Sequence, residues 1–346
     1  MRRLHPLPLL GALALLAFRP ATMVGQDAVA PWAGGLPGLE HPAAWGLGTG
    51  RVAAGVQHAE RWTQGREAFH TQWVGAGWRM GNGGQARRGA RWTLGWSSML
   101  DRQASGWTEG RHLVEGAVRI PLDKGWNGAA GLGVGVAHWT LDGRDWSWDA
   151  QYGPGGYNPG APTGEPDGLT SGGSWNPEVT AGVAAERPAR RGNAAPALKA
   201  AATLHHALRP IQPHFLPIAA DTTSRRLSWW MEGEGELGLE TLTWRAWHRG
   251  TLQGAAAWTE IGGSIGRTFG SASRYTRDAQ SHDVHIGWLY RSDGILRLPV
   301  TWRNGGITCW IAPGLRTGHR SPAATGWAAA IAWSPVRNGV TPLAAR

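Results

Sequence analysis

Segments of about ten residues, in which apolar side chains alternate with polar or small ones, recur along the chain from Arg51 onward. In the clearest of them, residues 90–98, the even positions from Trp92 to Trp96 are apolar and the odd positions are polar or glycine. Glycine, asparagine, aspartate or proline separates one segment from the next. Because successive side chains of a strand point to opposite faces, each segment is predicted to be a β-strand with one apolar face.

The polar faces of these segments distinguish a membrane barrel from a soluble β-sandwich or propeller, which would show the same alternation. They carry arginine, histidine, threonine and glycine, as the inner face of a transmembrane barrel does. The chain also has 23 tryptophans, many of them near segment ends, where membrane interfaces place the indole ring. The sequence therefore predicts an all-β protein, a transmembrane antiparallel β-barrel.

The number of strands follows from the number of segments. Fourteen are expected, because bacterial barrels have an even number of strands. A further segment, 307–317, could replace one of the weaker ones. The fourteen candidates are 51–61, 68–80, 88–100, 110–122, 128–141, 175–187, 197–208, 214–223, 225–238, 240–250, 253–267, 282–292, 294–303 and 324–334.

The first residues have the layout of a secretory signal peptide. Two arginines precede an apolar run, residues 7–18, which is too short to cross a bilayer as an anchor. Cleavage is expected after Gly25 or after Ala30, and a buried N-terminal helix is the alternative interpretation. We therefore expect export to the cell outer membrane. The predicted organisation is a signal peptide (1–25), a barrel (26–334) with a long loop (139–174), and a polar tail (335–346).

The net charge of +10 favours interaction with negatively charged partners. Nucleic acid is not expected, because the arginines are scattered and no helix-turn-helix or zinc pattern is present. Membrane lipid and the phosphates of lipopolysaccharide are the expected counter-charges. Cys309 is the only cysteine, so no internal disulfide framework can form.

One long stretch, residues 139–172, lacks periodicity and is rich in glycine, proline, aspartate and tryptophan. Loops of this length are uncommon in compact domains and usually carry function. Its three motifs are Trp148-Asp149-Ala150-Gln151-Tyr152, Gly156-Tyr157-Asn158-Pro159 and Pro162-Thr163-Gly164-Glu165. In order and spacing they resemble the PorP/SprF family of outer-membrane proteins, which is associated with type IX secretion and gliding motility in Bacteroidota.

Two segments after the loop, Glu178 to Ala184 and Leu204 to Pro210, are also similar to that family. The resemblance is weaker at the mature start, where His41-Pro42-Ala43 has histidine in place of the family's asparagine. It implies a non-catalytic barrel that helps to export or display a secreted surface protein, together with secretion-apparatus proteins. Under that hypothesis the motif residues bind a partner. The alternative function is a porin or a FadL-like passive transporter of small solutes.

A second candidate site is a patch of three glutamates, Glu232, Glu234 and Glu236, on one strand face. Carboxylates are costly on a lipid-facing surface, so the patch is expected to face the lumen. The predicted counter-charges are Arg245, Arg249 and Arg297.

Metal and catalytic sites are not predicted, and no cofactor is expected. Asp142, Asp145 and Asp149 could bind Ca²⁺ through oxygen atoms, but their spacing is not that of an EF-hand. Turn formation is the preferred role for Asn158 and Glu165.

The histidines give no metal pair either. His282 and His285 are three residues apart, so they are not expected to share a strand face. His205 and His206 would point to opposite faces of a strand. No nucleophile elbow is recognisable, and no enzyme activity is expected.

Overall fold

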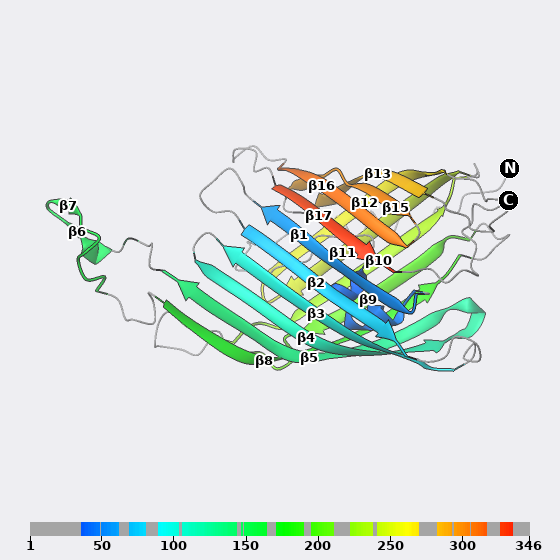
Figure 1. Ribbon diagram of the computed structural model, residues 1–346, viewed down its shortest axis with the longest axis horizontal. Helices are drawn as coiled ribbons and strands as arrows, with labels where there is room; N and C mark the ends of the chain where they lie inside the picture. Colours follow the sequence, from blue (N-terminus) through cyan, green and yellow to red (C-terminus); the bar gives the residue numbers. More distant parts are fainter. Residues whose placement is uncertain are drawn as a thin grey trace.

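A computed structural model describes residues 36–48, 50–61, 69–80, 89–103, 106–143, 147, 149–164, 171–189, 195–210, 222–237, 241–269, 282–292, 294–304, 306–316 and 326–334. Strands dominate this part of the chain (Figure 1). The wall strands are β1 (Val52–Arg61), β2 (Phe69–Arg79), β3 (Arg91–Gln103), β4 (Trp107–Pro121), β5 (Asn127–Asp142), β8 (Ser171–Arg187), β9 (Ala197–His205), β10 (Arg226–Glu236), β11 (Leu242–Gln253), β12 (Ala256–Phe269), β13 (His282–Arg291), β14 (Ile295–Arg297), β15 (Val300–Asn304), β16 (Ile307–Arg316) and β17 (Gly326–Trp333).

The short elements lie between these strands or before them. They are the 3₁₀ helices η1 (Pro37–Leu39), η2 (Pro42–Gly46), η3 (Asp123–Gly125) and η4 (Asp149–Gln151), and the two-residue strands β6 (Tyr152–Gly153) and β7 (Gly156–Tyr157). Among the described residues, no helix is long and apolar enough to cross a membrane.

The wall closes into an antiparallel barrel. Except for β14 and β15, each wall strand pairs with the next along the chain, and β17 returns to pair with β1, with Val56 opposite Ile331. β14 and β15 share one place in the wall, because both pair with β13 and with β16 on either side of Pro299. Counted by place, the barrel has fourteen strands, so the predicted fold is confirmed.

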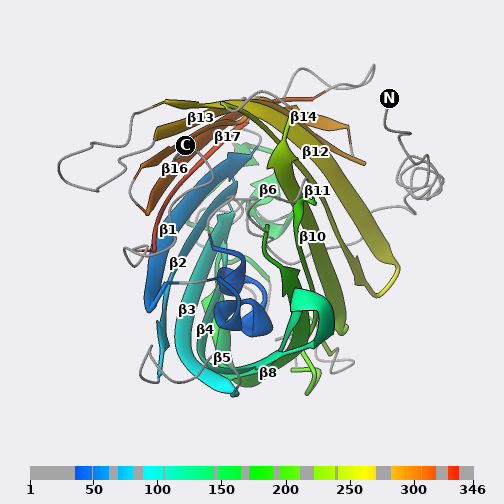
Figure 2. The same ribbon diagram turned by 90° about the vertical axis from the view of Figure 1, so that its right-hand side faces the viewer.

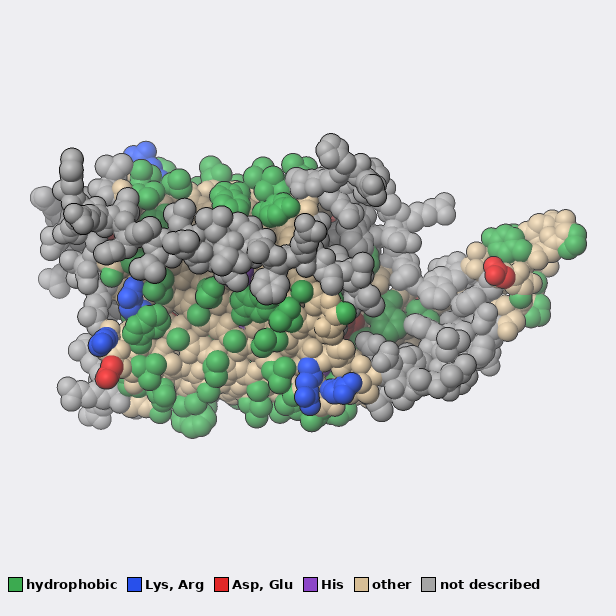
Figure 3. Space-filling model, turned by 180° about the vertical axis from the view of Figure 1, so that it is seen from behind, with side chains coloured by type: hydrophobic (Ala, Val, Ile, Leu, Met, Phe, Trp, Pro, Cys, Tyr) green, Lys and Arg blue, Asp and Glu red, His purple; other side chains and the backbone are tan. Residues whose placement is uncertain are grey.

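Alternation sets the two faces of the wall as predicted. On β3, Trp92 is 58% exposed and faces outward, whereas its neighbour Thr93 is 3% exposed and faces the lumen. Apolar side chains are spread over the outer surface of the barrel (Figure 3). This outward apolar face is the one that lipid covers in an outer-membrane barrel.

The tryptophans are not all placed on the outer surface, where a ring of them at each membrane interface (an interfacial girdle) is predicted. Outward tryptophans exist, but several others are buried and face the lumen, so the girdle accounts for only part of the tryptophan content. The buried wall tryptophans are Trp73, Trp139, Trp230, Trp247, Trp258 and Trp310.

The strand predictions differ from the structure mainly in one place. Residues Ile307–Arg316 form β16, within the alternative segment 307–317, whereas most of the predicted strand 214–223 lies outside the described residues. The proposed signal peptide and the tail 335–346 also lie outside them.

The two ends of the barrel are unlike. β1 begins and β17 ends at one end of the barrel, and the β6–β7 hairpin projects beyond the other (Figure 1). The links β5–β8 and β9–β10 are both at the hairpin end, because β5 and β9 run in the same direction as β1.

Candidate functional site: a lumen closed by an N-terminal segment

The lumen contains a segment of chain that is not part of the wall. Residues 36–48, the plug segment, fold into η1 and η2 inside the barrel (Figure 2). η2 packs against β3, β4, β5, β8 and β9, and η1 packs against β2 and β3. Pro37 and Pro42 begin the two helices, where a residue without an N–H and with a fixed φ is favoured. The segment therefore lies against one side of the lumen.

Trp45 anchors the plug segment in a notch lined by glycine. A Cβ added at Gly77 or Gly95 would lie 2.5 or 2.8 Å from atoms of the Trp45 ring, so a larger residue at either position would collide with the indole. The indole Nε1–H donates a hydrogen bond to the carboxylate of Glu115, which also accepts one from Ser97 Oγ at 3.2 Å. The notch thus has room for the indole ring and supplies an acceptor for its N–H.

The last residues of the plug segment are held by charged side chains of the wall. Arg79 Nη2 donates to the carbonyl oxygen of Leu47 at 2.8 Å. The Gly48 N–H donates to Glu186 Oε2 at 3.0 Å, and Arg119 forms an ion pair with the same glutamate. These bonds satisfy the backbone groups that the segment would otherwise leave unpaired inside the barrel.

His41 makes the polar contact at the other side of η2. Its Nδ1 is hydrogen-bonded to Thr203 Oγ1 at 2.9 Å, and its ring stacks on Trp230 at 6.4 Å between centroids. Burial, which is the largest cause, and the nearby cations Arg226 and Arg249 together lower the pKa of His41 from 6.5 to about 4, against the opposing effect of Glu40. The imidazole is therefore neutral at neutral pH.

The wall strands β10 to β13 and β15 fill the remaining lumen with their own charged side chains. Arg245 donates to Glu232 at 2.7 Å and to Glu234 at 3.1 Å, and Arg303 pairs with Glu234 at 3.2 Å. Arg249 forms an ion pair with Glu260. These pairs neutralise one another, so the buried charges are compensated within the wall.

The predicted glutamate patch is therefore partly right. Glu232 and Glu234 face the lumen and share Arg245. Glu236 lies at the exposed end of β10. The other two predicted partners differ: Arg249 pairs with Glu260 instead, and Arg297 is buried on β14.

The family-motif loop lies apart from this lumen. The loop is shorter than the predicted 139–174, because residues 139–142 belong to β5 and residues 171–174 belong to β8. Residues 149–164, which we call the arm, project from the barrel (Figure 1). The arm holds Asp149, Gln151, Tyr152, Gly156, Tyr157, Asn158, Pro159, Pro162, Thr163 and Gly164, whereas Trp148, Glu165 and Asp145 lie outside the described residues.

Local hydrogen bonds set the shape of the arm. Gln151 Nε2 donates to the carbonyl oxygens of Pro159 at 3.4 Å and of Ala161 at 3.2 Å. Asn158 Oδ1 accepts the N–H of Gly160 at 3.0 Å, which is the turn role expected of asparagine. Tyr152 and Tyr157 pack against each other at 5.1 Å and remain exposed. The arm is thus an ordered, outward-directed hairpin.

The expectation that His205 and His206 would point to opposite faces applies to a strand that contains both residues, and the structure has no such strand here. β9 ends at His205, and His206 has a left-handed backbone with φ 54°. Both rings are buried as a result. His206 binds Glu178 through its N–H and its Nδ1, each at 2.9 Å. His282 and His285 do lie on opposite faces, as predicted.

The plug segment is the functional feature that the sequence did not reveal. Residues 26–50 carry no strand pattern, so they read as a loop between the signal peptide and the barrel. The available signal was the run of apolar residues Leu36, Leu39 and Trp45 between prolines. Such residues need a buried surface, and the lumen supplies it.

No family model matches the chain, and no curated protein matches it either. Solved outer-membrane barrels are similar to it in structure at low identity. The Ralstonia pickettii toluene transporter TbuX is 12% identical with a TM-score of 0.44, covering 86% of this chain and 92% of its own. The CymD monoaromatic hydrocarbon channel is 9% identical with a TM-score of 0.43, covering 89% and 94%. BamA from Haemophilus ducreyi is 9% identical with a TM-score of 0.39, covering 82% and 70%. These similarities are too low to support an inference about function.

Proposed function

We propose that this chain is an outer-membrane channel for small solutes, closed by its plug segment in the conformation described above. The observation that carries the proposal is the seating of residues 36–48 inside the barrel, held to the wall only by non-covalent contacts. A separate segment in a lumen is the simplest element that can move without disturbing the strand ladder.

The burial of the lumen wall supports a closed state. Glu115 is 1% exposed, Arg226 is 0% exposed and Glu260 is 1% exposed, although they belong to different strands around the barrel. These side chains are shielded from solvent in the conformation described above. Passage of a solute therefore requires the plug segment to shift or leave.

The proposal includes an orientation of the barrel in the outer membrane. The chain is exported through the cleaved signal peptide at residues 1–25, and the end of the barrel where β1 begins and β17 ends faces the periplasm. The arm then lies on the cell surface, since bacterial barrels have short periplasmic turns and longer outer loops. The proposed channel carries solutes without chemical change.

Liposome swelling tests the proposal. A variant lacking residues 36–48 is reconstituted beside the wild type, and swelling is measured in sugars of graded size. We expect fast, size-dependent swelling for the deletion and slow swelling for the wild type. Equal rates for two properly folded barrels would contradict the proposal. A Gly116→Ala barrel is the matched control, because the side chain it adds meets nothing within 4 Å.

A second function, partnership with a type IX secretion apparatus and a secreted surface protein, is favoured by the arm. Its exposed tyrosines Tyr152 and Tyr157 are suited to contact another protein. The test is affinity purification from outer membranes of a Bacteroidota host that expresses the tagged chain, with and without residues 149–164. Recovery of secretion components with the full chain alone would support it. The same proteins with both chains, or with neither, would contradict it.

A further inference from the structure

Carboxylates are almost confined to the lumen side of the wall. In the strands that the structure describes, only Glu60 and Asp142 face outward, and Asp142 is the last residue of β5. A carboxylate facing a membrane is costly unless a cation or hydrogen-bond donors compensate it. Glu60 therefore needs a partner, and its surroundings show which kind.

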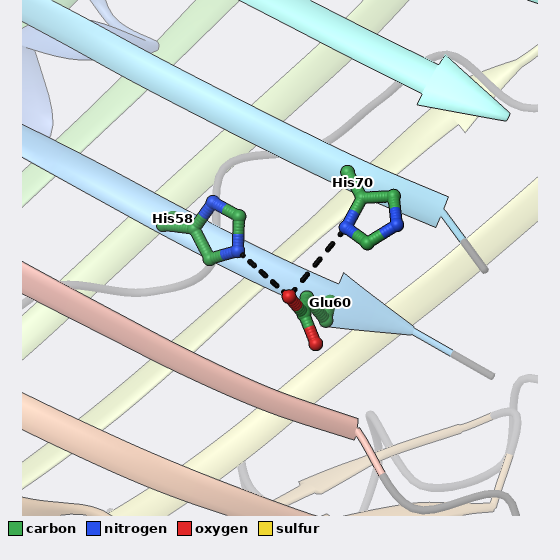
Figure 4. A group of neighbouring side chains, drawn as sticks. All are labelled: His58, Glu60 and His70. Carbon is green, nitrogen blue, oxygen red and sulfur yellow. Dashed lines mark hydrogen bonds and ion pairs between the residues drawn. The ribbon is translucent and has the colours of Figure 1, made fainter. Parts of the chain in front are cut away.

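Two histidines of the same outward face flank Glu60. His58 precedes it by two residues on β1, and His70 is its direct cross-strand partner on β2 (Figure 4). Glu60 Oε1 lies 3.3 Å from His58 Nε2 and 3.5 Å from His70 Nδ1. One nitrogen from each ring and this oxygen all lie within 4.8 Å of one another. Three ligand atoms of two types thus converge on one point.

We propose that His58, Glu60 and His70 bind a divalent transition-metal ion of the zinc and copper class. Imidazole nitrogen and carboxylate oxygen are ligands that Zn²⁺ and Cu²⁺ accept, at about 2.0–2.2 Å for zinc. Two such ligand atoms of a tetrahedral ion are roughly 3.3 Å apart, which follows from those bond lengths. Both measured separations from Glu60 Oε1 are close to that value.

Trp327 of β17 holds the carboxylate and one ring in place. Its indole Nε1–H donates to Glu60 Oε2 at 2.7 Å, which leaves Oε1 directed at the histidines. The His58 ring packs on the Trp327 ring at 4.9 Å between centroids. Partners of this kind orient metal ligands and raise affinity.

Exposure leaves room for the remaining ligands of the ion. The side chains of His58, Glu60 and His70 are 27%, 23% and 45% exposed. The site lies where β1 ends and β2 begins, at the end of the barrel from which the arm projects. Water can therefore complete the coordination sphere.

A metal ion at this site would connect strands where the barrel closes. β1 and β17 are the first and last wall strands, and their pairing closes the barrel. A metal held by β1 and β2, with Glu60 bonded to Trp327 of β17, ties three strands at this seam. Metal binding is expected to raise the resistance of the barrel to thermal unfolding.

The test uses the full chain with a purification tag free of histidine, folded in detergent micelles. Zn²⁺ binding is measured by calorimetry, and Cu²⁺ binding by electron paramagnetic resonance, which reports coordinated nitrogen. We expect one equivalent of either ion, with two nitrogen ligands for Cu²⁺, and weaker binding at acidic pH, because metal and protons compete for the imidazole nitrogens.

Four variants and one control separate this site from adventitious binding. His58→Ala, His70→Ala and the nearly isosteric Glu60→Gln should each lower affinity more than tenfold. Trp327→Phe should lower it by roughly tenfold. The control is His112→Ala/His138→Ala, which removes another outward pair of stacked histidines, 5.5 Å apart between ring centroids. It should bind as the wild type does.

Folding of every variant is checked by circular dichroism and by the heat-dependent shift of the barrel in gel electrophoresis. Absence of a stoichiometric site in the folded wild type would overturn the proposal. So would affinity that survives Glu60→Gln and His70→Ala in folded protein. In that case the three side chains form hydrogen bonds to one another and nothing more.

Discussion

The two sides of the lumen are filled in different ways. On the side of β2 to β5, glycines remove side-chain volume from the wall, and the plug segment occupies the space with Trp45. On the side of β10 to β13, the wall fills the lumen itself, with Arg245, Arg249 and their glutamates. One side is therefore occupied by a segment that can move, and the other by side chains that belong to the wall.

This difference assigns separate roles to the two sides. The charged side contains ion pairs between wall strands, so it stabilises the wall whether or not the plug segment is seated. The glycine side gains most of its contacts from the plug segment, so it changes most when that segment moves. Variants on the charged side should alter stability, and variants on the glycine side should alter the opening of the lumen.

The largest expected effect on stability comes from Arg245→Met. The change leaves Glu232 without its bonded arginine and Glu234 with Arg303 alone, and removing one member of a buried ion pair costs roughly 3–5 kcal/mol. The free energy of unfolding in urea measures the loss. Glu236→Gln is the control, since Glu236 is exposed at the end of β10 and its change should leave stability unaltered. A stable Arg245→Met barrel would show that the charged side is not a structural element.

The next effect in size is expected from Gly95→Ala. The new Cβ would lie 2.8 Å from the Trp45 ring, and overpacking of this kind costs roughly 1–3 kcal/mol. Overpacking destabilises the seated state of the plug segment relative to the withdrawn state. Single-channel recording should therefore show more frequent openings while the barrel stays folded. Gly116→Ala, on the outward face of the next strand, should record as the wild type does. Identical recordings for the two variants would remove the distinction between the two sides.

A smaller effect is expected from pH. Burial lowers the pKa of His41 from 6.5 to about 4, so the ring binds a proton more weakly in the seated plug segment than in water. Acidification from pH 6.5 towards pH 4 therefore favours the state in which the plug segment has left its seat. The contribution of neutral His41 to seating is complete above pH 6.5 and is lost as the pH falls towards 4. Channel opening should rise over this range in the wild type and rise less in His41→Gln. The same pH dependence in both proteins would exclude His41 as a contributor.

The barrel wall could be predicted from the sequence because each strand carries its own alternation. Position in the strand alone predicts the correct faces for Trp92, Thr93 and Trp96. The cost of charge against lipid predicts the inward direction of Glu232 and Glu234, and Arg245 is one of their predicted partners.

The plug segment and the outward metal site could not be predicted in the same way. Trp45 meets Gly77 and Gly95 only after the wall has closed, so the match exists between distant residues and leaves no local pattern. Glu60 and His70 become neighbours through the register of β1 and β2, which the sequence does not specify. Alternation identifies faces, whereas register and lumen contents depend on the whole fold.

The central claim, that movement of the plug segment opens the lumen, is tested most directly by locking that segment to the wall. A Cβ added at Gly46 would lie 3.7 Å from the Ala117 Cβ, close to the ~3.8 Å of a disulfide. Ala129 is changed to glycine in the same protein, because its Cβ would lie 3.1 Å from the new atom. Cys309 is replaced by serine, so that Gly46→Cys and Ala117→Cys are the only cysteines.

The measurement is single-channel conductance of this double-cysteine protein before and after reduction, beside the two single-cysteine proteins. Our account predicts a silent channel when the disulfide is formed, and openings like those of the single-cysteine proteins after reduction. Equal conductance in the oxidised and reduced states would show that solutes pass without movement of residues 36–48, and would contradict the account.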